Sequence, residues 1–167
     1  MKTPSLALEE CIRAYDREIA RKNSLESKAS ALLSTSAIVV SLLNSFIAFI
    51  IAGIVNFSNF GILIVLNVGT TILIGISIYW SLSALKIKEH FFPFDVKDPN
   101  VLQEKLDKKE VDLIIDLIDQ YSAIIPQINK FNEDKVDLID KSWKLLIGGI
   151  FVSFIGFITT IFINKGV

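Results

Sequence analysis

Two long stretches of the chain contain no charged residue, and this pattern predicts its main elements. The first runs from Ala29 to Leu85 and the second from Leu145 to Asn164. A hydrocarbon core of about 30 Å is crossed by about 20 helical residues, so the first stretch is long enough for two crossings and the second for one. Because backbone groups find no water in hydrocarbon, each crossing is expected to be an α-helix.

The longer stretch is expected to form a hairpin, since turn-forming residues gather near its middle, at 56–61. We therefore predict transmembrane helices over 31–55, 60–85 and 143–164. A cleaved signal peptide is the competing interpretation of the first span. It fits poorly, because the apolar run exceeds the usual length of about 15 residues and a polar-rich segment precedes it.

The segments outside the spans also have helical patterns. Residues 1–30 are predicted to form a helix continuous with the first span, because Leu8, Ile12, Tyr15 and Ile19 recur at spacings of three and four. Residues 86–141 are predicted to form a second helical segment. Its helix is expected to begin at Asp98 and Pro99.

Pro126 lies inside this second segment and is expected to kink or split the helix. At 1.5 Å per residue, an unbroken helix over residues 99–141 would extend roughly 64 Å, against roughly 45 Å for the amino-terminal helix. We therefore expect the chain to fold back near Glu110 or Pro126.

An apolar seam at heptad spacing runs along the same segment. Such a seam predicts packing against another helix, and we expect it to join copies of the chain into a homo-oligomer. Lys135 interrupts the seam once. The seam consists of Ile114, Leu117, Tyr121, Ile124, Ile128, Phe131 and Leu138.

The distribution of charge predicts an orientation. Every Lys and Arg except Lys165 lies in or beside the two segments outside the spans. Positive residues near span ends are retained in the cytoplasm, so both segments are expected inside the cell and the carboxyl terminus outside. Tyr79, Trp80 and Trp143 then fall at one interface, which interfacial aromatic side chains favour. We expect a multi-pass protein of the plasma membrane.

Composition narrows the function. The chain has 167 residues, is 51% hydrophobic and has a mean hydropathy of +0.53, which favours an integral membrane protein. A net charge of −1, from 17 basic and 18 acidic residues, argues against nucleic acid as a partner.

The catalytic inventory is thin, because Cys11 and His90 are the only residues of their kinds. We expect no enzyme, no metal and no cofactor. A lipid-processing enzyme is the weakest of the alternatives.

A basic stripe follows one face of the first helix and consists of Arg13, Arg17, Arg21 and Lys28. Guanidinium groups suit phosphate, so the stripe could hold an anionic ligand. The other interpretation is ion pairing with acidic residues of the second segment. In that case we expect Arg21 near Glu133 or Asp134, and Lys28 near Asp137.

Small and polar residues also line the spans. They either face a pore formed by several copies or allow close helix packing, and both interpretations stay open. Apart from Lys144 at the start of the third span, no charged residue lies within a span, which argues against a proton relay or a voltage sensor. The main positions are Ser34, Ser41, Asn44 and Ser45 in the first span and Gly149, Ser153, Gly156 and Thr160 in the third; Asn67, Thr70, Ser77 and Ser81 form a similar series in the second.

A resemblance adds to this interpretation. The first span is preceded by an acidic residue and then Lys28-Ala29-x-x-Leu32-Leu33, and the third by Asp140-Lys141-x-Trp143-Lys144. Both the motif and the layout resemble small transmembrane effectors of prokaryotic anti-phage systems, of the Pycsar and SLATT-domain types. The resemblance implies a protein that responds to a signalling nucleotide and impairs the inner membrane. It carries over no nucleotide-binding residue.

The sequence thus predicts an all-α fold, with three transmembrane helices and a cytoplasmic helical bundle or coiled coil. The hypothesis for function is an integral membrane effector that oligomerises and disrupts or permeabilises the bilayer on a cytoplasmic signal, with a nucleotide as a candidate trigger. The alternative is a non-enzymatic membrane scaffold that presents its helical bundle to a protein partner. Inducible leakage from liposomes distinguishes the two.

Overall fold

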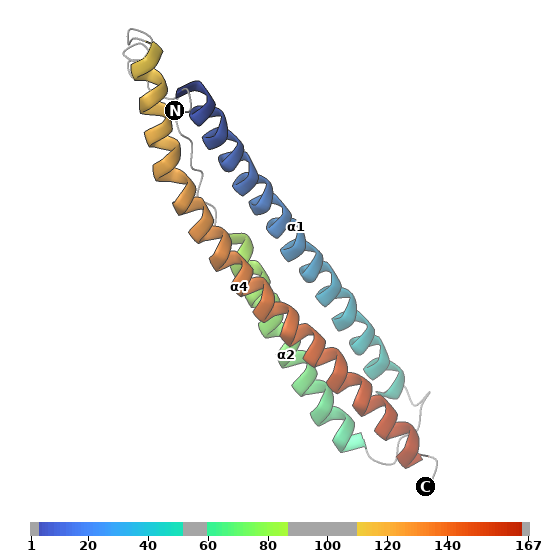
Figure 1. Ribbon diagram of the computed structural model, residues 1–167. Helices are drawn as coiled ribbons and strands as arrows, with labels where there is room; N and C mark the ends of the chain where they lie inside the picture. Colours follow the sequence, from blue (N-terminus) through green and yellow to red (C-terminus); the bar gives the residue numbers. More distant parts are fainter. Residues whose placement is uncertain (1–3, 52–59, 87–109, 165–167) are drawn as a thin grey trace. The chain divides into compact units, whose positions relative to one another are not determined.

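The computed structural model describes residues 4–51, 60–86 and 110–164, and all of them are helical (Figure 1). Helix α1 spans Pro4–Ile51, α2 spans Phe60–Lys86 and α4 spans Glu110–Asn164. Each is long and apolar enough to cross a membrane. The all-α prediction with three candidate spans is therefore confirmed. The expected turn at 56–59, the residue His90 and the expected helix start at Asp98 lie outside the described residues.

Two of the helices join a polar half to an apolar half without interruption. Helix α1 continues from its polar segment into the apolar one, as predicted. Helix α4 also runs through Pro126, so the helix is not split there, and of the two expected effects of this proline the split is wrong. Proline removes one backbone hydrogen bond at a cost of about 3 kcal/mol, which the packing of a long helix on both sides can offset. Pro126 itself is exposed, so its ring displaces no packed side chain.

The chain divides into two compact units. The polar unit contains residues 4–25 of α1 and 110–135 of α4. The apolar unit contains residues 26–51 of α1, all of α2 and residues 136–164 of α4.

In the polar unit, α4 packs against α1 of the same chain. The rings of Tyr15 and Tyr121 meet edge to face, with centroids 5.4 Å apart and planes at 72°. Asn132, which is buried, donates from Nδ2 to the backbone oxygen and to the carboxylate of Glu18, both at 2.9 Å. Ile128 is also buried. The heptad seam is thus used at least partly within one chain, and its role between copies stays a prediction.

In the apolar unit, the contacts fix the direction of each helix. Leu32 of α1 and Leu146 of α4 share a buried cluster with Ile74 of α2. Further along, Phe46 of α1 meets Phe157 of α4, so these two helices run parallel.

Helix α2 runs the other way, because Ser77 contacts Ser142 whereas Thr70 contacts Ser153. The Lys86 end of α2 therefore coincides with the start of this part of α4. There the Lys141 ammonium lies 5.4 Å from the centroid of the Trp80 ring. The basic ends of the apolar helical segments meet at one end of the unit.

Candidate functional site

A cluster of buried serines joins α2 to α4. Ser77, Ser81 and Ser142 have no exposed surface. The Ser77 hydroxyl donates to the Ser142 carbonyl at 2.8 Å, and the Ser142 hydroxyl donates to the Ser77 carbonyl at 2.9 Å. The hydroxyls of Ser81 and Ser142 lie 2.6 Å apart. This reciprocal pattern satisfies polar groups that would otherwise be buried at a cost, and it fixes the register of the two helices.

The small residues of α4 also face α2. A Cβ added at Gly149 would lie 3.1 Å from Cγ1 of Ile74, and one added at Gly156 would lie 3.1 Å from Cδ1 of Leu66. Between them, Ser153 donates to the Thr70 hydroxyl at 3.3 Å. For these three residues the structure favours close helix packing within the chain over a pore lining. The side chain of Thr160 lies outside the described part of the chain.

The polar face of α1 has the opposite environment. Its members Ser34, Ser41, Asn44 and Ser45 are all exposed on the apolar unit. The hydroxyls of Ser34 and Ser45 donate to backbone carbonyls one turn earlier in α1, at 3.1 and 2.9 Å. The amide of Asn44 has no hydrogen-bond partner among the described residues. The polar face of α1 is therefore not buried by the other described helices.

Three of the four residues in the basic stripe have side-chain contacts within the polar unit. Arg21 pairs with Glu133 at 2.6 Å and donates to Asn129 at 3.0 Å, so the predicted proximity of Arg21 to Glu133 is confirmed. The hydrogen bond to Glu133 is the largest cause that raises the pKa of Arg21. Arg13 pairs with Glu9, and Arg17 donates to the backbone oxygen of Arg13. The pairing of Arg21 with Glu133 favours the ion-pair interpretation, whereas the pairing of Arg13 with Glu9 lies within one helix and does not involve the second segment.

The prediction for Lys28 is wrong. Asp137 pairs instead with Lys141, one turn away on the same helix, at 2.6 Å. Residues four apart on a helix are neighbours, so Lys141 reaches this carboxylate without any tertiary contact. Lys28 is exposed and has no ion pair within the described part of the chain.

Sequence reasoning missed two buried hydroxyls. Ser142 lies one residue before the predicted start of the third span, which is why the spacing of polar residues within spans did not include it. Ser36 of α1 is buried, and its hydroxyl has no hydrogen-bond partner among the described residues. Within the described helices, no group of three or more His, Cys, Asp or Glu side chains could hold a metal ion.

No protein-family model, curated protein or solved structure matches this chain. The fold therefore defines the class: an all-α protein with three candidate membrane-spanning helices. The exposed polar face of α1 is the candidate for further interaction.

Proposed function

We propose that this protein is an integral membrane effector whose copies associate through the polar face of α1 and permeabilise the bilayer. The exposure of Asn44 and its serine neighbours on the apolar unit carries the proposal. Hydrocarbon offers no hydrogen bond to an amide, so a lipid-facing Asn favours association with another helix.

The chemistry of this face suits a water-filled assembly. Ser34 and Ser45 have already satisfied their donors on their own backbone, and each hydroxyl oxygen can still accept a hydrogen bond from water. When several copies bring these faces together, Asn44 gains partners and the seam becomes hydrophilic. An apolar exterior remains toward lipid, because the outward residues of α2 and α4 include Val65, Ile72 and Phe151.

Orientation follows from the charges at one end of the apolar unit. Lys86, Lys141 and Lys144 end or begin its helical segments, and by the distribution of basic residues this end faces the cytoplasm. The polar unit is then the cytoplasmic part that receives a signal. The resemblance to anti-phage effectors supplies a signalling nucleotide as the trigger to test first.

Leakage of ions from liposomes that contain the purified chain tests this function. Replacing Asn44 and Ser45 with Leu is expected to weaken self-association and to reduce inducible leakage. An interhelical hydrogen bond in a membrane contributes about 1 kcal/mol, so loss of one such bond would weaken association roughly fivefold. The matched control is Thr71→Val on α2, which removes an exposed hydroxyl that bonds within its own helix.

The control is expected to leave both association and leakage unchanged. Leakage that stays at baseline in the unmodified protein with candidate nucleotides, together with stoichiometric capture of a protein partner, would contradict the effector and favour the scaffold. Unchanged leakage in the Asn44→Leu, Ser45→Leu variant would contradict the role of this face.

A further inference from the structure

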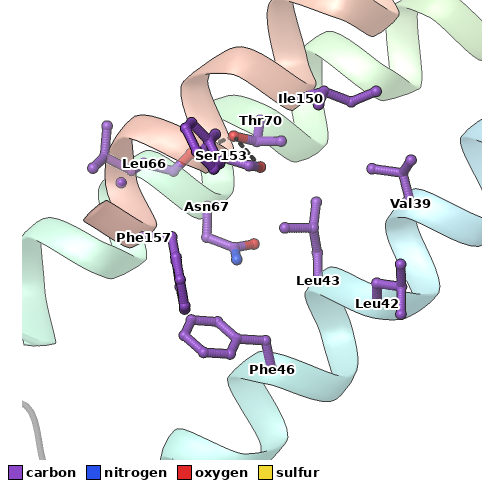
Figure 2. Close-up of a pocket in the computed structure, with 12 residues that line it drawn as sticks. Val39, Leu42, Leu43, Phe46, Leu66, Asn67, Thr70, Ile150, Ser153 and Phe157 are labelled. Atoms are coloured by element: carbon purple, nitrogen blue, oxygen red, sulfur yellow. Dashed lines mark hydrogen bonds between the residues drawn. The ribbon is translucent and has the colours of Figure 1, made fainter. Parts of the chain in front are cut away.

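A cavity of about 360 Å³ opens between the three helices of the apolar unit. This volume lies in the range of roughly 300–1,000 Å³ that is typical of small-molecule sites. Leu43 and Phe46 of α1, Asn67 of α2 and Phe157 of α4 surround it (Figure 2). The Phe46 and Phe157 rings meet edge to face, with centroids 5.7 Å apart. The lining is mainly aliphatic and aromatic, which favours an apolar occupant.

One polar group in this lining is not satisfied. Figure 2 shows the Asn67 amide directed into the space between the helices, toward Phe46. Its Oδ1 receives only a long contact of 3.5 Å from the Thr71 hydroxyl, and its Nδ2 has no partner among the described residues. The hydroxyls of Thr70 and Ser153, by contrast, donate to Leu66 and Thr70. The cavity therefore presents an unused donor among apolar walls.

The apolar walls and the unused amide donor of Asn67 together indicate which kind of molecule fits the cavity. A trapped water needs two to four polar partners. Asn67, Thr70 and Ser153 could hold water at their own side of the cavity, but the aliphatic and aromatic walls leave most of the volume without a polar partner. A ligand that fills the cavity with hydrocarbon and accepts one hydrogen bond would satisfy both the walls and the amide. A long acyl chain with a carbonyl oxygen has this chemistry, and a bilayer supplies it at high concentration.

We propose that this cavity binds one acyl chain, whose carbonyl oxygen accepts a hydrogen bond from Nδ2 of Asn67. The inference depends on the membrane location proposed above but not on pore formation. A fatty acid and a glycerolipid ester share this chemistry. The occupied cavity would join α1 to the α2 and α4 pair through the ligand.

Saturable binding of radiolabelled ligands to the purified full chain in detergent tests the site. The ligands are methyl oleate, oleate, dioleoyl phosphatidylglycerol and octadecene, which has no acceptor oxygen. We expect one saturable site per chain for at least one of the three ligands with a carbonyl oxygen. Preference for oleate would identify a fatty acid as the source, and preference for the two esters a glycerolipid.

Asn67→Leu removes the donor and is expected to weaken binding of the preferred carbonyl ligand about fivefold, the effect of one net hydrogen bond. Binding of octadecene should be unchanged. Val39→Phe adds a ring to another lining position and should weaken binding of all four ligands. Asn44→Leu removes an amide outside the cavity lining, so it should bind every ligand as the unmodified chain does. Helix content measured by circular dichroism checks that each variant is folded.

Two results would overturn the site: partition without saturation, or an Asn67→Leu variant with an unchanged preference for the carbonyl ligand over octadecene. The proposed function fails separately, since Asn44→Leu is expected to impair leakage while retaining the acyl chain. Leakage without acyl binding would contradict only the cavity assignment, and acyl binding without leakage would contradict only the effector.

Discussion

Replacing Ser142 with Ala tests whether the serine cluster holds α2 against α4. The Ser142 hydroxyl donates to the Ser77 carbonyl at 2.9 Å and lies 2.6 Å from the hydroxyl of Ser81. Alanine removes both interactions and leaves almost no cavity. The Ser77 hydroxyl keeps its bond to the carbonyl of residue 142, which alanine retains.

The expected cost follows from these two lost bonds. Hydrogen bonds between helices in a membrane protein contribute about 0.6 kcal/mol on average and about 1.7 at most. Ser142→Ala should therefore lower the free energy of unfolding by about 1 to 3 kcal/mol. The lower end applies if the Ser81 hydroxyl turns to the freed carbonyl of Ser77, four residues earlier in the same helix.

Equilibrium unfolding in mixed micelles measures this cost. Trp80 and Trp143 adjoin Ser81 and Ser142 in the sequence, so their fluorescence reports on the site. Ser83→Ala is the matched control and should change stability by less than about 0.5 kcal/mol. Within the described part of the chain, the Ser83 hydroxyl bonds only to the Tyr79 carbonyl of its own helix. A Ser142→Ala variant as stable as this control would refute the reasoning. In a double-mutant cycle, Ser81→Ala should cost less once Ser142 is already Ala.

Three further predictions concern other parts of the chain. Gly148→Ala meets nothing within 4 Å and should be neutral or stabilising in the same unfolding assay. Gly149→Ala has the same gain in helix propensity but crowds buried Ile74, so it should be less stable than Gly148→Ala by about 1 to 3 kcal/mol. Burial raises the pKa of both Tyr15 and Tyr121 above the ordinary value of 10.0, with charge interactions adding to it. The stability that the neutral rings provide is therefore present below pH 10.0 and is lost as pH rises through the raised pKa values. Unfolding measured at increasing pH should show a smaller loss of stability for Tyr15→Phe than for the unmodified chain, and ultraviolet titration of phenolate checks that the pKa values are raised. If the amino terminus is cytoplasmic, a membrane-impermeant maleimide should label Cys11 only in permeabilised cells, and labelling of intact cells would contradict the orientation.

The broad fold could be predicted from the sequence because hydropathy and helix length are local properties. Within the uncharged stretch from Ala29 to Leu85, apolar segments of about 20 residues can satisfy their backbone groups in lipid as helices, and α1 and α2 agree with this. The pairing of Arg21 with Glu133 was also predictable, since opposite charges on packed helices must match in depth. The continuity of α4 was not predictable, because the cost of Pro126 is local whereas the packing that offsets it is tertiary.

The spacing of small and polar residues does not predict whether the face they form is buried, as the faces of α1 and α4 show. Residues three or four apart share a helix face whether that face packs or stays exposed, so the periodicity of Gly149, Ser153 and Gly156 resembles that of Ser41, Asn44 and Ser45.

Side-chain size gives the distinction. With no Cβ at Gly149 and Gly156, α2 approaches so closely that an added methyl group would lie 3.1 Å from Ile74 or Leu66. The face of α1 has no glycine at its four candidate positions and carries a bulky amide instead. Glycine therefore indicates the face that is closed by packing within the chain, whereas Asn44 indicates the face that is left for an external partner.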